Sequence, residues 1–325
     1  MCRAFTNGKK EGKRVDDFRK EVIKELEKKL GNGYCIFPKD KLKNNNFTVH
    51  GICIRKRDEV IGTVVYVDEY ILLYAVGLMK LEKIADELIQ QCHKGEIPSK
   101  IADDLEDFGR MRDKVRIRLI NYDANPTELK NVPHRKFLDL AVTYYLDIDV
   151  TISEGNASII VSNELMERWN VAEGDLYRAG MENLQVKDEC FAIDIPGLLK
   201  EIVQEEDEEE VMAVLDEIEK EGVPKVEMYV ASNRKHLFGA ACMLDLSFLK
   251  QLADSKGCDL NIYPSCVNEL IVIPIKDGNE DCINTEDVWE INMSNVPKEE
   301  WLSNSIYLYD RAKQEVSIYK KGAPL

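Results

Sequence analysis

Apolar residues recur at helical spacing near the start of the chain. Val15, Phe18 and Val22 stand three and four residues apart, which predicts an amphipathic helix over residues 15–30. Gly31 follows, at the position where a helix end favours a residue that tolerates positive φ. The same reasoning predicts further helices at residues 69–76, 80–93, 98–112, 163–169, 173–181 and 196–203.

Apolar, β-prone runs separated by polar turns predict hairpins, and three times a hairpin is followed directly by a helix. These hairpin–helix units cover residues 47–76, 137–169 and 226–256. Negligible sequence identity relates the three units, so a shared supersecondary preference explains them at least as well as duplication does. The predicted fold class is α+β, with antiparallel or mixed sheets and helices packed on one face.

The stretch from Val226 to Pro274 has the most complete pattern. Its predicted order is strand, strand, helix, strand, strand, at residues 227–231, 238–243, 244–256, 260–263 and 270–273. If the helix returns the chain in a crossover, the turns that hold His236 and Cys266 lie at opposite ends of the sheet, roughly 16 Å apart. We therefore expect no nucleophile and base pair between these two side chains.

The length of 325 residues accommodates two domains with hydrophobic cores of their own. We predict a basic flexible lead at residues 1–14 and an N-terminal helix, hairpin and helix domain at residues 15–113. A C-terminal α+β domain would then cover residues 114–325, with hairpin–helix units at 137–169 and 226–274.

The charge is distributed unevenly along the chain. The net charge is −16, yet residues 1–43 carry 13 basic and 7 acidic side chains, a net of +6, which leaves −22 for the remainder. Binding to nucleic acid depends on Lys and Arg that contact phosphates, so an acidic protein of this kind argues against it. The basic N-terminal segment could nevertheless bind a phosphate backbone or an acidic partner.

The cysteine usage indicates reduced thiols. Nine cysteines, odd in number and never spaced C-x-x-C, fit neither a disulfide framework nor a zinc site. Four histidines are too few for a His-rich metal cage, so we expect no metal and no cofactor. The longest charge-free run, Tyr70–Met79, is far shorter than the roughly 20 residues of a membrane span. We therefore predict a cytoplasmic protein without membrane association.

The best candidate for chemistry stands just before an apolar run. His134 and Arg135 precede a predicted buried strand that contains Asp139. A buried carboxylate needs a partner, and Arg135 or a backbone donor could supply it. The group is therefore either a structural ion pair or an acid/base or ligand site. His50, inside an apolar strand, is predicted to be a structural histidine with a backbone partner.

The second candidate is the turn from Pro264 to Glu269. Ser265 and Asn268 are typical turn residues and are also candidate binding residues. Glu269 is a candidate catalytic carboxylate that could join His134. Its proximity to Cys266 would raise the pKa of that thiol, which argues against a cysteine enzyme. The common phosphate, dinucleotide, zinc-protease and serine-hydrolase motifs are absent from the sequence.

Several short motifs form a specific combination. They are Asn44-Asn45-Asn46 with His50-Gly51-Ile52, the run Val132–Leu140, Phe238-Gly239-Ala240-Ala241, Pro264-Ser265 with Glu269, and Leu302-Ser303 before Tyr307-Leu308-Tyr309-Asp310. Over most of its length the chain resembles an uncharacterised family of bacterial domains of unknown function, typical of gut-dwelling anaerobic Firmicutes. The family pattern has His where Asn268 stands and Gly where Asn46 stands. The resemblance implies a bacterial cytosolic protein and brings no established activity.

Three functional hypotheses follow. The favoured one is a non-catalytic binding or adaptor protein that engages another protein or a small ligand, because no catalytic signature is present. The first alternative is an enzyme with an acid/base site around His134, Arg135 and Asp139. The second alternative is nucleic-acid association through the basic N-terminal segment.

Overall fold

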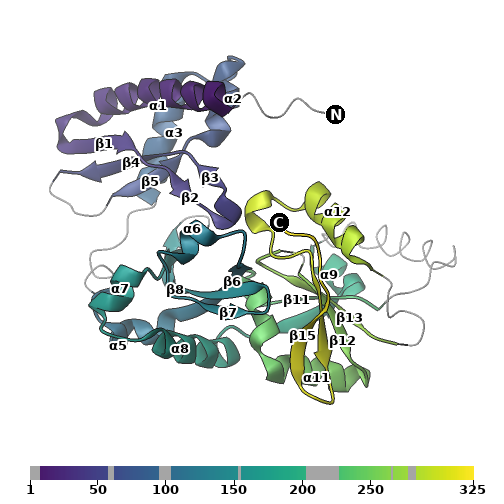
Figure 1. Cartoon of the computed structure of the whole chain (residues 1–325). Helices are drawn as coiled ribbons and strands as arrows, with labels where there is room; N and C mark the ends of the chain where they lie inside the picture. Colours follow the sequence, from purple (N-terminus) through teal and green to yellow (C-terminus); the bar gives the residue numbers. More distant parts are fainter. Residues whose placement is uncertain are drawn as a thin grey trace. The chain divides into compact units, whose positions relative to one another are not determined.

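A computed structural model describes residues 8–57, 62–94, 104–152, 155–202, 227–264, 266–276 and 283–325 (Figure 1). The chain forms two compact units. Unit 1 consists of Met1–Lys43, Phe47–Asp104 and Asp149–Ala157, and unit 2 consists of Asn44–Asn46, Leu105–Ile148 and Ser158–Leu325. The sequence placed a single division between residues 113 and 114 and predicted neither of the two short exchanged segments.

Unit 1 is built on a three-stranded antiparallel sheet in the order β1-β4-β5. Its elements are α1 (Gly8–Leu30), η1 (Gly31–Gly33), β1 (Tyr34–Pro38), β2 (Lys41–Leu42), β3 (Thr48–Val49), β4 (Gly51–Lys56), β5 (Thr63–Tyr66), α2 (Asp68–Ala75) and α3 (Leu81–Lys94). The core joins Phe18 and Val22 of α1 to Ile52 of β4 and Ile84 of α3. Burying apolar side chains from both helices and the sheet supplies the main stabilisation of this unit.

Most predictions for unit 1 are confirmed. The hairpin–helix unit at 47–76 is present as β4, β5 and α2. The helix predicted over residues 15–30 is the larger part of α1, but α1 already begins at Gly8. Residues 8–14, predicted as part of a flexible lead, are therefore helical. Residues 1–7 of that predicted lead lie outside the described residues.

The first sheet of unit 2 is centred on a long strand. Its elements are α5 (Phe108–Met111), η3 (Arg112–Lys114), β6 (Val115–Asn121), α6 (Pro126–Leu129), β7 (Arg135–Phe137), β8 (Leu140–Ile152), β9 (Gly155–Ile160), α7 (Asn163–Arg168) and α8 (Glu173–Val186). β8 pairs with β6, β7 and β9. The predicted hairpin and helix at 137–169 correspond to β8, β9 and α7. Every residue of β6 is buried, as expected for a strand covered on both faces.

The second sheet of unit 2 has six strands in the order β10-β11-β13-β12-β14-β15, all paired antiparallel. Its elements are β10 (Phe191–Asp194), α9 (Ile195–Ile202), β11 (Tyr229–Ser232), η4 (Gly239–Leu244), α11 (Leu246–Lys256), β12 (Leu260–Tyr263), β13 (Leu270–Pro274), α12 (Thr285–Asn295), η5 (Lys298–Glu300), β14 (Ile306–Asp310) and β15 (Glu315–Lys320). Helices and antiparallel sheets are thus combined, and the predicted α+β class is confirmed.

The predicted hairpin at the start of the 226–274 region is wrong. Residues 239–244 form the 3-10 helix η4, and β11 pairs with β10 and β13 instead. A Cβ added at Gly239 would lie 2.1 Å from the Ser232 hydroxyl oxygen and 2.5 Å from the Asn268 carbonyl oxygen. The chain passes too close to these neighbours for an extended strand with alternating side chains.

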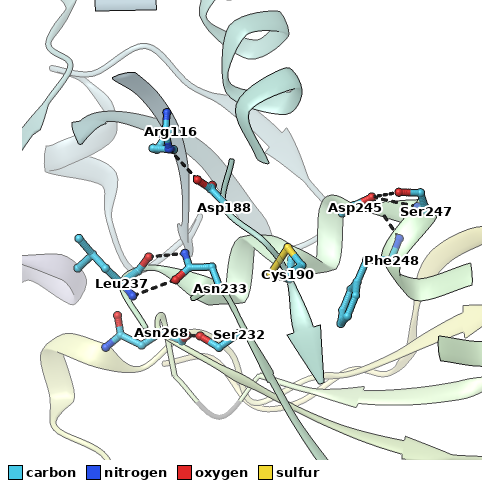
Figure 2. The surroundings of a disulfide bond; sticks show 11 residues. Arg116, Asp188, Cys190, Ser232, Asn233, Leu237, Asp245, Ser247, Phe248 and Asn268 are labelled. Atoms are coloured by element: carbon cyan, nitrogen blue, oxygen red, sulfur yellow. Dashed lines mark hydrogen bonds and ion pairs between the residues drawn. A yellow bond between two sulfur atoms is a disulfide. The ribbon is translucent and has the colours of Figure 1, made fainter. Parts of the chain in front are cut away.

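The predicted direction of these strands is also wrong. Ala231 of β11 pairs with Leu270 of antiparallel β13, so the turn after β11 and the turn before β13 lie at the same end of the sheet. The Ser232 hydroxyl donates to the Asn268 carbonyl at 2.7 Å, as Figure 2 shows. The two turns were expected at opposite ends because 238–243 was taken as a strand.

A short asparagine loop, η2 (Asn44–Asn46), belongs to unit 2 although the strands on either side of it belong to unit 1. Asn45 and Asn46 have φ of +58° and +54°, which asparagine tolerates better than most residues. The Asn125 amide donates to the side-chain oxygens of Asn44 and Asn45 at 2.9 and 3.2 Å. The Asn46 side-chain amide donates to the Ala124 carbonyl at 2.9 Å, which fits an asparagine at this positive φ, where glycine was expected.

A disulfide joins Cys190, just before β10, to Cys242 in η4 (Figure 2). Their Cα atoms are 5.8 Å apart and the two residues are separated by 52 positions. The expectation that the cysteines are reduced thiols is therefore wrong for this pair. The free cysteines among the described residues are Cys35, Cys53, Cys92, Cys258 and Cys266.

Candidate functional site

Arg135, one of the predicted site residues, is committed to a structural pair. Its guanidinium donates to both carboxylate oxygens of Glu173 at 2.8 Å and lies 3.5 Å from the ring centre of Tyr177. The Tyr144 hydroxyl donates to the same carboxylate. The pKa of Arg135 is raised, chiefly by its hydrogen bonds to Glu173. A bidentate, stacked guanidinium of this kind fixes β7 against α8.

Asp139 has a different set of partners. Its carboxylate accepts hydrogen bonds from the hydroxyls of Ser303, Ser305 and Tyr307 at 2.7, 3.0 and 2.6 Å. The sequence predicted an arginine or a backbone donor as its partner, so the identity of the partners was missed. Three hydroxyl donors thus satisfy this carboxylate.

His134 lies apart from both of these groups in its bonding. Its Nδ1 is 3.0 Å from the carbonyl oxygen of Val132, and its ring contacts the ring of Tyr122. The structure therefore gives His134, Arg135 and Asp139 three separate sets of hydrogen-bond partners. The carboxyl of Glu173 has a lowered pKa. Burial raises this pKa, but the hydrogen bonds from Arg135 and Tyr144 outweigh the effect of burial.

The turn from 264 to 269 is held by its own backbone and side chains. The Asn268 side-chain oxygen accepts from the Phe238 amide at 3.0 Å, and the Asn268 amide donates to the Cys266 sulfur at 3.3 Å. The Glu269 carbonyl accepts from the Cys266 amide. Ser265 lies outside the described residues. The pKa of Cys266 is raised to about 11, chiefly by burial and in smaller part by the charge of Glu269, in the direction predicted from the sequence.

A cleft of about 730 Å³ opens on unit 1 between α1 and α2. Its apolar wall is formed by Val15 and Phe18 of α1 and by Ile71, Leu72 and Ala75 of α2. Tyr74 closes one end, because its ring packs on Phe18 with centres 5.3 Å apart and its hydroxyl donates to Glu21 at 2.7 Å. A concave, mainly apolar surface with a few polar groups is typical of binding sites.

The rim of this cleft carries a histidine and aspartate pair. The Asp68 carboxylate accepts from the main-chain amide of His50 and lies 2.7 Å from its ring Nδ1. In the neutral ring Nδ1 therefore holds the proton, and Nε2 presents a lone pair. The rim also includes Arg14, Asp17 and Glu21. The prediction that His50 has a backbone partner missed the carboxylate.

The register of the first hairpin explains how this pair forms. Gly51 pairs with Tyr66, and the Val67 amide donates to the His50 carbonyl at 2.9 Å. His50 is thereby placed opposite Val67, the residue just before Asp68, which begins α2. A Cβ at Gly51 would come within 2.7 Å of the Lys39 carbonyl oxygen, so only glycine allows this close approach. The hairpin predicted from the sequence, together with the glycine after His50, would have been enough to predict that His50 lies beside Asp68.

Helix α2 is apolar on nearly every side, yet Tyr70 is its only buried residue. Leu72, on the lip of the cleft, is 68% exposed. A helix that is hydrophobic all round is normally buried on all sides. The outward face of α2 is therefore an exposed apolar surface of the kind that marks an interaction site.

A family model matches residues 15–311 of the chain. The chain belongs to DUF5688, a family of unknown function. Searches among curated proteins and among solved structures found no match for this DUF5688 protein. The family resemblance inferred from the sequence is confirmed, and it adds no activity to the geometry described above.

Two further properties concern metals and membranes. Among the residues that the structure describes, no group of three or more His, Cys, Asp or Glu side chains could hold a metal ion in this DUF5688 protein. Within the same residues, no helix combines the length and the apolar character needed to cross a bilayer.

Proposed function

We propose that this protein is a non-catalytic binding or adaptor protein, and that the cleft of unit 1 holds an apolar, cationic segment of another protein. The observation that carries the proposal is the outward face of α2, which is apolar and largely exposed. A binding partner that covered Leu72 would remove this surface from water, at about 25 cal/mol per Å² of apolar area.

The charges of the rim favour a cationic partner. Asp17, Glu21 and Asp68 contribute three carboxylates, against one guanidinium from Arg14. Asp17 pairs with Lys20 and Asp68 with His50, so Glu21, which accepts from the neutral Tyr74 hydroxyl, contributes most to this preference. The lone pair on Nε2 of His50 adds a hydrogen-bond acceptor. A Lys or Arg side chain that lies beside apolar residues would meet both the carboxylates and the apolar wall.

The partners of the predicted catalytic residues support a binding role over catalysis in unit 2. Arg135 and Asp139 make internal hydrogen bonds, and the raised pKa of Cys266 makes it a poor nucleophile. One observation favours an enzyme as the second candidate function. His50, with its tautomer fixed by Asp68, would suit a general base at the cleft.

Nucleic-acid association through the N-terminal segment is less well supported. Basic side chains of α1 form ion pairs with nearby acids: Arg19 with Asp16, Lys20 with Asp17, Lys28 with Glu25, and Lys29 with Asp86. Cations that are already paired release fewer counterions when they meet phosphates. These basic side chains are therefore better explained as a solvated helix surface.

Peptide selection tests the proposed function directly. A displayed library of random peptides would be selected on the full-length protein, and affinities would be measured by fluorescence anisotropy. We expect peptides rich in Leu with Lys or Arg, and an affinity loss of about tenfold, or 1.4 kcal/mol, for Leu72→Ser. Leu78→Ser is the matched control, because Leu78 is 77% exposed and does not line the cleft.

Two outcomes would overturn the proposal. One is a selection that yields no peptide above background. The other is a set of peptides that bind Leu72→Ser as tightly as the unchanged protein. Peptides whose affinity depends on Leu78 instead would place the binding surface outside the cleft.

A further inference from the structure

The Cys190–Cys242 disulfide differs from a structural framework in its setting. It is accompanied by free cysteines elsewhere among the described residues, among them Cys258 in the same unit. Small secreted domains with a disulfide framework are disulfide-dense, whereas a disulfide in a protein of a reducing compartment, as the sequence predicts for this chain, is usually transient and catalytic or redox-sensing. The two sulfur atoms therefore form a candidate exchange site.

The two ends of the bond are unequally accessible. Cys242 is fully buried, with 0% exposure, between buried Ala241 and Met243 in η4. Cys190 is only partly buried, and it precedes β10 at the edge of the six-stranded sheet. Of the two residues, Cys190 is therefore the more accessible to an incoming thiolate. Exchange depends on access and on which sulfur is attacked.

We propose that Cys190 is a site of thiol–disulfide exchange with small thiols. The thiolate of a small thiol attacks the Cys190 sulfur, a new sulfur–sulfur bond forms there, and the Cys190–Cys242 bond breaks. Cys242 leaves with the electron pair and takes up a proton from water to become a thiol. A second thiolate then attacks the sulfur of the small thiol, which releases a symmetric disulfide and leaves Cys190 reduced.

Breaking the disulfide removes the covalent link between the residue that precedes β10 and η4. Among the strands that the structure describes, β10 is an edge strand that pairs with β11, and none of its side chains is buried. Just before it, the carboxylate of Asp188 pairs with Arg116 at 2.6 Å, as Figure 2 shows. After exchange the segment keeps this ion pair, the Arg234–Glu189 ion pair, the ring contact of Phe191 with His236 and the pairing with β11, but it loses its covalent link to η4. Exchange at Cys190 thereby acts as a modification that loosens the sheet edge.

The test uses the full-length protein and glutathione. The oxidised protein is incubated with reduced glutathione, quenched with N-ethylmaleimide, digested at low pH and mapped by mass spectrometry. We expect glutathione on the peptide that contains Cys190 and a free thiol at Cys242, under conditions where circular dichroism shows the native fold. Hydrogen exchange of the β10 amides should become about tenfold faster in the same sample.

Two single variants form a matched pair. With oxidised glutathione, Cys242→Ser should acquire glutathione at Cys190, whereas Cys190→Ser should leave Cys242 unmodified, with at least about a tenfold difference in rate. Exchange that occurs only when urea unfolds the protein would overturn the proposal, as would modification of Cys242 at a rate equal to that of Cys190. If either variant fails to fold, mapping of the unchanged protein decides between these outcomes.

Discussion

The Tyr307 hydroxyl donates a hydrogen bond of 2.6 Å to the Asp139 carboxylate, across 168 positions of sequence. The bond connects the turn between β7 and β8 to strand β14, and thus the first sheet of unit 2 to the second. Tyr307 is fully buried, and burial together with the charge of Asp139 raises its pKa well above the usual range. The hydroxyl therefore stays protonated and remains a donor throughout the physiological pH range.

Tyr307→Phe should lower the free energy of unfolding by about 1.5–3 kcal/mol, because a hydrogen bond to a charged acceptor is lost inside the protein. Urea unfolding followed by far-UV circular dichroism measures the change. Ser305→Ala removes a second donor from the same carboxylate and should act in the same direction. Ser294→Ala, at an exposed position of α12, is the control and should be close to neutral. An unchanged midpoint for Tyr307→Phe would contradict the assigned role.

Asp188 should make stability depend on pH. Burial raises its pKa to about 6 although Arg116 opposes the shift. The folded state then binds more protons than the unfolded state between about pH 4 and 6, so the contribution of this group falls as the pH rises through that window. Asp188→Asn removes the contribution. Its stability relative to the unchanged protein should improve by roughly 2 kcal/mol from pH 4 to pH 7.

Urea unfolding at several pH values measures this difference, and Asp123→Asn at an exposed turn controls for loss of a charge. A constant difference between Asp188→Asn and the unchanged protein across the window would show that Arg116 holds the carboxylate ionised throughout.

Gly239→Ala should be strongly destabilising, by about 3 kcal/mol or more, because the new methyl group meets backbone atoms of Asn233 and Asn268 that cannot rotate away. Gly174→Ala in α8 is the matched control, since nothing lies within 4 Å of its added Cβ and alanine favours a helix. Thermal melting of both variants measures the contrast. Equal melting temperatures would show that η4 can shift away from β11.

The disulfide should stabilise unit 2 by about 4 kcal/mol, the loop-entropy value for a loop of 52 positions. Cys190→Ala, measured by urea unfolding without reductant, should therefore shift the midpoint of unit 2 downward. Cys35→Ala in unit 1 replaces a free cysteine and is the control, because it should leave the unfolding midpoint of unit 2 unchanged. Equal stability of Cys190→Ala and the unchanged protein would mean that the unfolded chain gains little freedom when the bond is removed.

Local patterns were enough to predict the main helices and strands of unit 1, although not the first turns of α1. The spacing of Phe18 and Val22 in α1 and the Gly77 that follows α2 are short-range signals, and the hairpin at 47–76 needs only neighbouring strands. The apolar run at 238–243 could not be interpreted locally. Its conformation depends on the approach of Gly239 to Ser232 and Asn268, which are brought near by strand pairings distant in sequence.

The candidate site shows the same contrast between features set by local sequence and features set by residues distant in sequence. His134, Arg135 and Asp139 are close in sequence, but their partners Glu173 and Tyr307 come from far along the chain, so proximity in sequence was a poor guide to shared chemistry. The pair of His50 and Asp68 was within reach, because the register of one predicted hairpin places the two residues together. Its carboxylate partner was missed when His50 was assigned a backbone partner.

The exchanged segments have a consequence for synthesis on the ribosome. Residues 44–46 belong to unit 2, most of which is made later, and residues 149–157 belong to unit 1, most of which is made earlier. The nascent chain therefore cannot complete unit 1 until residues 105–148 of unit 2 have been translated, and unit 2 includes an asparagine loop that is made before either. A gene cut at the main boundary between the units would leave each product without a segment that only the other encodes.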